Sequence, residues 1–598
     1  MKRNDLILVA TTLLFSVLFY RQVAGINFLL FNIVLIIALV LKDKKVLQYK
    51  TWRLAACGAL LSSVCVLLYG NIASVIVNAI SLALLSGLSF SPASSVIVSV
   101  AFTFISSAFA YIFMIVDLVN RENKDSVSAK PKQRSLLIII PIAVTLIFFC
   151  VYRSASPLFS QFSDKIIDLI SWGWFFFTLM GFILLYGFFY HKRLKQITDM
   201  DENTPVNLSP KEYAPYVLFG KPLSVNEESF SGIMLFVLLN LLILIVNALD
   251  FNYIFISHTL PEGLKYSEFL HQGVGALILS IIMAVAIILF YFRGALNFYE
   301  NNKTIKYLAY LWILQNMFML FSTAFKNNIY IHEYGLTYKR IGVYVYLLLT
   351  LIGLAVTFNK ILRTKANIYL FHINGWLFYG VYIIFCFFNW DNIITVYNVT
   401  HPKGIDYGYL LDLAYSNVPD LLTVQQSTIK YPETDSSDAS LLYEKVYSFL
   451  QFREKYDWQS WCYDNNRIYN QLAGANRSMK IKKLQLNVLG IESLKPLEVF
   501  SNIQVLDLSS NRIENLNDIS SFPMLKKLEL AGNRIYSLKG IEKLHQLEFL
   551  DLCNNPITDY VPLYTLNNLK ELYVCKVDSA KLEVLKEHLP NTHIVMYP

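Results

Sequence analysis

The sequence predicts a chain of two parts: an all-α polytopic transmembrane bundle of about 11–12 helices, followed by an α/β solenoid of short repeats. Apolar residues make up 55% of the 598 positions and charged residues only 16%, whereas a soluble chain carries about 25%. Twelve apolar runs occupy residues 1–390, and leucines recur every 22 residues between 479 and 598. This composition excludes a single soluble domain, a disordered chain and a small disulfide scaffold.

A helix that crosses the hydrocarbon core of a bilayer needs about 20 mostly apolar residues, with a range of about 17–25. The first candidate run follows Lys2 and Arg3 as in a signal peptide. No small-residue cleavage site follows it, and a second run begins at once, so we expect a retained helix. The predicted runs are residues 6–20, 25–41, 54–70, 72–90, 95–117, 136–152, 166–190, 230–250, 269–292, 305–325, 341–359 and 367–388.

Lysine and arginine in the loops predict the orientation of the bundle, because cytoplasmic loops are enriched in both. From residue 120 onward, one set of alternate loops carries 16 basic residues and the opposite set carries 6. The first set is therefore expected in the cytoplasm. The basic residues at 2–3 and 42–53 are also expected in the cytoplasm. Three full spans between residues 54 and 117 would place them on the opposite side of the membrane from the basic loop after residue 120. We expect one candidate there to be re-entrant or no span, which leaves 11 crossings and a cytoplasmic N-terminus.

The net charge of +8 is unevenly distributed along the chain. Residues 1–400 hold 30 Lys and Arg against 19 Asp and Glu, whereas residues 401–598 hold 21 against 24. A basic surplus between apolar runs is typical of membrane orientation rather than of nucleic-acid binding. The expected location is a membrane, with the lipid bilayer as partner, no nucleic acid bound, and the chain after residue 390 outside the cytoplasm.

The C-terminal part, residues 479–598, contains about five units with the pattern L-x-L-x-x-N-x-I, which is typical of leucine-rich repeats. The 22-residue spacing resembles the internalin-type class. One such repeat cannot bury its apolar face alone, but a stack of repeats can. The first leucine of each unit is Leu484, Leu506, Leu528, Leu550 or Leu572.

Three features of these repeats are candidate functional or structural positions. Asn511, Asn533 and Asn555 are expected to turn inward and pair with backbone groups that the turns leave open. Cys553 and Cys575 occupy equivalent positions on neighbouring strands about 4.8 Å apart, so they could form a disulfide in an oxidising compartment or remain free thiols. The strand position between the two leucines is either a protein-binding concave face or a solvated strand face. It is occupied by Gln485, Asp507, Glu529, Asp551 and Tyr573.

Residues 391–478, between the bundle and the repeats, are predicted to be a juxtamembrane segment and linker. Proline and glycine interrupt its first half, and apolar spacing predicts a helix near residues 441–456. Trp458 and Trp461 follow this helix, and two positions remain open for them: the membrane interface or the first repeat.

The membrane part lacks a phosphate-binding loop, a dinucleotide fingerprint, a nucleophile elbow and a zinc-protease motif, so no enzyme activity and no cofactor are expected. Two polar clusters nevertheless begin apolar runs on the predicted outer side. Three interpretations remain open for them: a substrate or ion site, a metal site, or interfacial residues that pair with one another and cap helices. The predicted site contains no metal. The cluster residues are Glu268, His271, His332, Glu333, Lys339 and Arg340.

Several segments resemble a bacterial multipass membrane family that is catalogued only as a domain of unknown function. They are YSEFLHQGVGALILSI, FRGALN, HEYGLTYKRIGVYVYLLLTLIGL and the spaced motif YNV…LD…Y…VPDLL. The resemblance covers roughly residues 1–425. It implies a multipass protein of the bacterial cytoplasmic (inner) membrane, in which residues 391–425 belong to the membrane module. It carries no activity over to this chain. We therefore expect a membrane protein that displays its repeats for protein recognition or envelope scaffolding, or alternatively a transporter or channel with the repeats as an accessory.

Overall fold

A computed structural model describes residues 3–125, 131–160, 162–163, 171–190, 195–210, 217–218, 221–222, 224–257, 280–400, 406–426 and 436–597. The chain forms two compact units. The helical unit comprises Met1–Tyr330 and Ile341–Phe388, and the repeat unit comprises Ile331–Arg340 and Asn389–Pro598. Residues 389–478 thus belong to the same compact unit as the repeats, together with the turn at 331–340.

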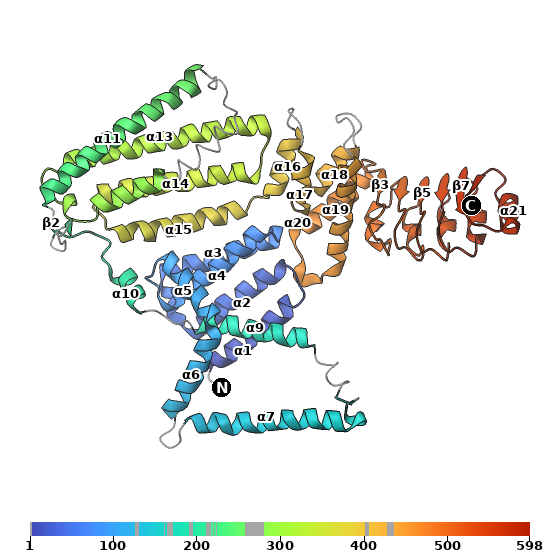
Figure 1. The fold of residues 1–598 in the computed structure, drawn as a ribbon, viewed down its shortest axis with the longest axis horizontal. Coiled ribbons are helices and arrows are strands. Elements are labelled where there is room, and N and C mark those ends of the chain that lie inside the picture. The colour runs from blue at the N-terminus through green and yellow to red at the C-terminus, as the bar shows by residue number, and fades with distance from the viewer. Residues whose placement is uncertain are drawn as a thin grey trace. The chain divides into compact units, whose positions relative to one another are not determined.

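The helical unit consists of helices and one short hairpin of two strands (Figure 1). A further helix, Ser280–Tyr291, follows residues outside the described part. The named helices are α1 (Arg3–Phe19), α2 (Ile26–Lys42), α3 (Lys50–Tyr69), α4 (Ile72–Phe90), α5 (Val96–Ala108), α6 (Ala110–Asp125), α7 (Pro131–Ala155), α9 (Trp172–Phe189), α10 (Lys195–Asn203), α11 (Val225–Asn252), α13 (Lys303–Tyr334), α14 (Tyr338–Leu362) and α15 (Asn367–Cys386); the strands are β1 (Val217–Leu218) and β2 (Lys221–Pro222).

Among the described residues, seven helices are long and apolar enough to cross a membrane, or up to eight if one bent pair forms a single span. This count is lower than the predicted 11–12 helices. Helices α1 and α2 have 17 residues each, and α2 is counted among the shorter apolar helices rather than among the seven. The predicted runs 166–190 and 269–292 lie partly outside the described residues.

The bent pair lies between residues 54 and 117, where three predicted spans are inconsistent with the cytoplasmic location expected for the basic loops on both sides. Helix α5 is followed by Ala110–Asp117 at an angle of 71°. Phe109 interrupts the helical backbone between them. Such a bend is compatible with a broken span or with a re-entrant loop. The two arrangements give different numbers of membrane crossings for residues 54–117.

The repeat unit begins with helices and continues as a ladder of short strands (Figure 1). All six strands are parallel and follow the sequence order β3-β4-β5-β6-β7-β8. Its helices are α16 (Trp390–Thr400), α17 (Tyr407–Asp412), α18 (Val418–Gln426), α19 (Ser436–Lys455), α20 (Tyr463–Arg477) and α21 (Ser579–His588); its strands are β3 (Lys483–Gln485), β4 (Val505–Asp507), β5 (Lys527–Glu529), β6 (Phe549–Asp551), β7 (Glu571–Cys575) and β8 (His593–Tyr597).

Repeat spacing determines the register of this sheet. Leu484 pairs with Leu506, Leu506 with Leu528, and so on through Leu572, always 22 residues apart. Each of these leucines is fully buried. Short 3-10 turns close the opposite side of the repeats, and they bury Phe500, Phe522 and similar side chains. The turns are η6 (Lys495–Phe500), η7 (Ile519–Ser521), η8 (Ile541–Lys543) and η9 (Val561–Thr565).

Candidate functional site

The turn between α13 and α14 is the described part of the predicted polar cluster, and it packs within the repeat unit. The His332 and Glu333 side chains approach to 3.8 Å, with His332 largely exposed. Arg340 donates from Nη1 to the carbonyl of Tyr334 at 2.7 Å, so it closes the turn on itself. Lys339 is exposed. Among the described members of the cluster, His332 thus lies beside Glu333, and Arg340 binds the backbone of its own turn.

Asn398 of α16 holds the turn from the opposite side. Its Oδ1 accepts the Leu336 amide at 2.6 Å, and its Nδ2 donates to the Leu336 carbonyl at 2.8 Å. Gly335 has φ +81°, and a Cβ there would lie 2.6 Å from Asn398 Oδ1. Glycine is required here both by the backbone conformation and by the close approach of the amide. Two of the segments that carry the family resemblance are therefore in direct contact.

Asp391 at the start of α16 adds a second connection to the same turn. Its carboxylate accepts the Tyr338 hydroxyl at 2.9 Å, while the Tyr409 hydroxyl accepts the Tyr338 amide at 2.9 Å. Burial raises the pKa of the Asp391 carboxyl, although hydrogen bonds from Tyr338 and the Ala414 amide oppose that rise. Because Asp391 is only 7% exposed, its hydrogen bonds are needed to offset the loss of hydration.

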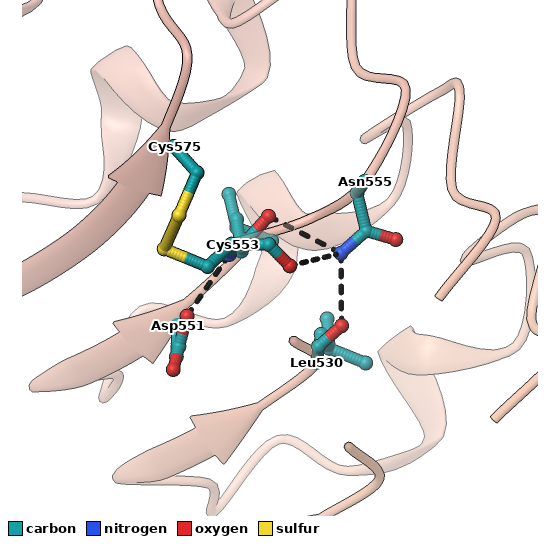
Figure 2. The surroundings of a disulfide bond; sticks show 6 residues. Leu530, Asp551, Cys553, Asn555 and Cys575 are labelled. Atoms are coloured by element: carbon teal, nitrogen blue, oxygen red, sulfur yellow. Dashed lines mark hydrogen bonds between the residues drawn. A yellow bond between two sulfur atoms is a disulfide. The ribbon is translucent and has the colours of Figure 1, made fainter. Parts of the chain in front are cut away.

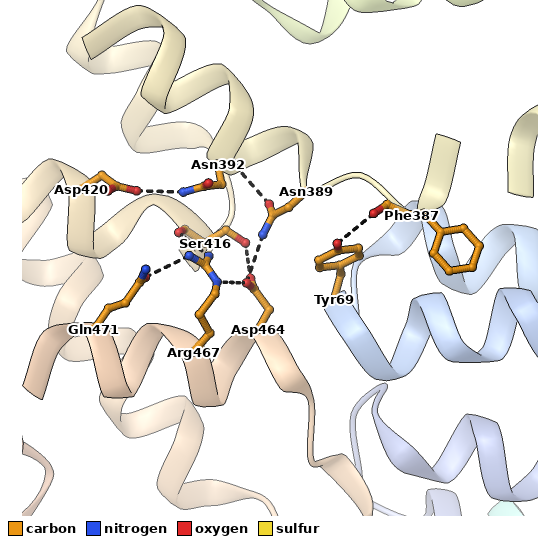
Figure 3. Close-up of polar contacts among 9 residues, drawn as sticks. All are labelled: Tyr69, Phe387, Asn389, Asn392, Ser416, Asp420, Asp464, Arg467 and Gln471. Atoms are coloured by element: carbon orange, nitrogen blue, oxygen red, sulfur yellow. Dashed lines mark hydrogen bonds and ion pairs between the residues drawn. The ribbon is translucent and has the colours of Figure 1, made fainter. Parts of the chain in front are cut away.

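Asp464 of α20 is the centre of a second polar network (Figure 3). Its carboxylate accepts from Arg467 Nε at 2.7 Å, from Asn389 Nδ2 at 3.0 Å, and from the Ser416 hydroxyl. Arg467 also donates to the Ser416 carbonyl at 3.1 Å. Asp464 is 4% exposed, so this network joins α20 to the residues around α16 and η4 (Tyr415–Asn417) in a buried setting.

Lys445 of α19 fixes the backbone around η4. Its ammonium donates to the carbonyls of Leu411 at 3.0 Å and Leu413 at 2.7 Å, and to Asn417 Oδ1 at 3.0 Å. Burial lowers its pKa to about 8, although the negative charges of Asp391 and Asp412 oppose this shift. Lys445 lies three residues after Leu442 and four before Phe449, so helical spacing places it on the apolar face of α19. That spacing does not identify the carbonyls that it binds.

Residues 436–478 form two helices that cap the first repeat, and the first of them, α19, lies over the predicted helix near 441–456. Both α19 and α20 pack against η6. Asn476 at the end of α20 donates to the Ile481 carbonyl at 3.1 Å and accepts the Asn502 amide at 2.8 Å. Trp458 and Trp461 are 60% and 45% exposed, and thus are not part of the buried cap. The segment 432–435 of the predicted linker lies outside the described residues.

The three repeat asparagines connect each repeat to the one before it. Asn511 Nδ2 donates to the carbonyls of Leu486 and Leu508, both at 2.8 Å, and its Oδ1 accepts the amides of Leu489 and Ile491, both at 3.0 Å. The side chains of Asn533 and Asn555 make the equivalent contacts one and two repeats later. Side-chain amides thus satisfy backbone groups that no strand or helix pairs.

The strand-face row, defined as Gln485, Asp507, Glu529, Asp551 and Tyr573, lies in register across β3 to β7. Burial raises the pKa of Asp551, and the neighbouring charges of Glu529 and Asp507 add to this shift. The Glu529 carboxylate pairs with Lys527, whose ammonium lies 4.5 Å from the centre of the Phe549 ring. The row therefore combines three carboxylates with aromatic side chains at one end.

Cys553 and Cys575 are joined by a disulfide (Figure 2), with Cα atoms 4.8 Å apart. The Cys553 amide donates to Asp551 Oδ1 at 2.9 Å, and the Cys553 carbonyl accepts from Asn555 at 3.3 Å. The bond therefore connects the repeat of Asn555 to the last repeat, in which Val577 stands at the asparagine position, beside the strand-face row.

This disulfide predicts a specific labelling pattern. Full-length protein denatured without reductant should leave Cys553 and Cys575 unlabelled by an alkylating reagent, because a disulfide sulfur is no nucleophile. The Cys553→Ser variant should gain one label, at Cys575. Peptide mass spectrometry distinguishes these positions from Cys57, which is a free and exposed thiol. Labelling of both positions in the unreduced wild type would contradict the pairing.

Glu268 and His271, the remaining members of the predicted polar cluster, lie outside the described residues. In the described ranges, no group of three or more His, Cys, Asp or Glu side chains is arranged to hold a metal ion. The structure therefore brings His332 and Glu333 together and adds Asn398, Asp391, Asp464 and Lys445. Of these four, only Asn398 lies in a segment that carries the family resemblance.

Residues 6–424 match a family described as "Domain of unknown function (DUF4153)", so the chain belongs to that family. Residues 523–563 match leucine-rich repeats in two copies. These matches confirm both resemblances seen in the sequence. No curated protein matches the chain.

Two solved structures are similar to the repeat region. Internalin C2 of Listeria monocytogenes is 28% identical over 21% of this chain and 55% of that chain, with a TM-score of 0.19. Internalin F of the same organism is 19% identical over 26% of this chain and 41% of that chain, also with a TM-score of 0.19. The chain thus spans about half the length of these proteins.

Proposed function

We propose that this chain is a multipass protein of the bacterial cytoplasmic membrane that holds a leucine-rich-repeat solenoid outside the cytoplasm to bind a protein partner. The observation that carries this proposal is the strand-face row, since five side chains in register form a continuous surface on a rigid parallel sheet. No catalytic residues and no cofactor are part of the proposal.

Two observations support the outward orientation. Basic residues concentrate in the loops that would then face the cytoplasm, 16 against 6. The disulfide between Cys553 and Cys575 belongs to an oxidising compartment, because cytoplasmic thiols are kept reduced. A reporter fused after residue 598 that is active only in the cytoplasm would overturn this orientation.

The binding experiment uses full-length protein in detergent and envelope extract from the source bacterium. The row variant carries Asp507→Asn, Glu529→Gln and Asp551→Asn, which remove three charges but keep acceptor oxygens. The matched control carries Glu498→Gln, Glu514→Gln and Glu587→Gln at exposed positions outside the row. We expect the wild type and the control to capture the partner, and the row variant to capture at least tenfold less of it. Equal capture by all three proteins would contradict binding at the row.

A further inference from the structure

Helix α11 carries an ion pair near each end. Glu228 pairs with Arg293 at 2.7 Å, and Asp250 pairs with Lys326 of α13 at 2.5 Å. The two carboxylates are 22 residues apart, about 33 Å along a helix, which is close to a hydrocarbon core of about 30 Å. Both α11 and α13 are long and apolar enough to cross a membrane. On the proposed placement of these helices in a bilayer, the two ion pairs lie at the two ends of its core, and residues near 240 lie close to its middle.

Polar side chains form a continuous contact between α11 and α13 at this depth. Gln315 donates to Asn240 Oδ1 at 2.9 Å, and Asn240 donates to the Leu308 carbonyl at 3.0 Å. One helical repeat further on, Asn247 donates to the Gln315 carbonyl at 3.0 Å. We name as the polar seam the residues Asn240, Asn247 and Asp250 of α11 with Gln315, Ser322 and Lys326 of α13.

Two acceptor atoms of the polar seam lack a donor among the described residues: Asn247 Oδ1 and Gln315 Oε1. Asn247 is 7% exposed, so its amide oxygen is buried. A buried acceptor without a donor costs about 1–3 kcal/mol. The missing donor is water or a cation. The charges of Asp250 and Lys326 cancel, so the polar seam has no net negative charge to attract a cation, and water is the favoured donor. The neighbouring amides give a water molecule the two or more polar partners that it needs.

Aromatic rings close the seam below Asn240. Phe236, one turn earlier on α11, is fully buried, and its ring centre lies 5.4 Å from that of Trp312 and 6.0 Å from that of Tyr291. Polar contacts resume beyond these rings, where the hydroxyls of Ser231 and Tyr291 lie 3.0 Å apart, followed by the Glu228–Arg293 pair. Phe236 therefore separates two polar stretches on a single line across the bilayer core.

We propose that α11, α13 and the helix Ser280–Tyr291 form a gated proton path, with water in the polar seam and Phe236 as its closed gate. A proton added to the water chain at the Asp250 end is relayed as one is released at the other end, so no side chain is changed by the transfer. The inference rests on the proposed placement of these helices in a bilayer. It is independent of partner binding by the repeats.

The test uses purified full-length protein in liposomes with a potassium diffusion potential and an enclosed pH-sensitive dye. The Phe236→Ala variant should raise proton influx at least tenfold above the wild type, because it removes the closing ring. Adding Asn247→Leu and Gln315→Leu to that variant should abolish the increase. Asn316→Leu is the matched control added to Phe236→Ala, since Asn316 donates only within its own helix, to the Trp312 carbonyl, in the bonds described here. It should leave the increase intact.

Influx through Phe236→Ala equal to that of protein-free liposomes overturns the proton path. Influx that persists after Asn247→Leu and Gln315→Leu overturns the role of the seam. If Phe236→Ala does not fold, as judged by size-exclusion chromatography, Trp312→Leu opens the same ring contact from α13 and replaces it. Co-flotation of the protein with the liposomes tests membrane placement separately, so a failed placement is distinguishable from a failed path.

Discussion

Replacing Asn511 by leucine is expected to destabilise the repeats by about 3 kcal/mol or more, because it leaves buried backbone groups unpaired. The side chain is 6% exposed and pairs with two amides and two carbonyls at 3.0 Å or less. Leucine has a similar size but can neither donate nor accept. Each unpaired buried group costs about 1–3 kcal/mol, so even the lower bound summed over these groups is large.

Hydrogen exchange of the full-length protein measures this effect locally. Amides of residues 484–513 should exchange about a hundredfold faster in the Asn511→Leu variant, since each 1.4 kcal/mol is tenfold in an equilibrium. Asn515→Leu is the matched control in the same repeat, because Asn515 is exposed. Unchanged protection around Leu489 and Ile491 in Asn511→Leu would show that these contacts contribute little.

The register of the repeat strands is predictable because the period of the sequence pattern is also the separation of the residues that pair between neighbouring strands. A 22-residue period gives every strand the same offset, so Leu484 opposite Leu506 follows from spacing alone. The same spacing places Asn511 beside the preceding repeat. Nothing comparable exists for the helical unit, where hydropathy identifies apolar runs but not the length of the helix that each forms. For example, the apolar runs 6–20 and 25–41 form the helices α1 and α2, whose bounds of Arg3–Phe19 and Ile26–Lys42 the runs do not define.

Contacts between distant segments are what the sequence could not predict. The Asn398 side chain meets the backbone of Leu336, 62 residues away, and neither position follows a repeat or a helical period that refers to the other. His332 and Glu333 attract attention by residue type, although Asn398 and Asp391 hold the turn. An asparagine or aspartate within a mostly apolar segment is a weak signal until its partner is known.

Replacing Asp464 by alanine is expected to destabilise the cap of the repeat unit by about 3 kcal/mol. Removing one partner of a buried ion pair typically costs about 3–5 kcal/mol, and the lower end applies because the Arg467 side chain is 20% exposed. The substitution also leaves the amide of Asn389 and the hydroxyl of Ser416 without their acceptor. Since these residues belong to α20, the start of α16 and η4, the loss should loosen all three together.

Exchange of the amides in residues 389–400, 406–426 and 463–477 should therefore rise together, whereas Glu587→Ala, at an exposed position of α21, should change none of them. Asp464→Asn keeps an acceptor oxygen for Ser416 or Asn389 but loses the charge, so its effect should be smaller than that of alanine. A rise confined to α20 would mean that the Asp464 network stabilises one helix only. A rise in all three segments would mean that it couples the residues of the family module at 389–424 to the helix that caps the first repeat.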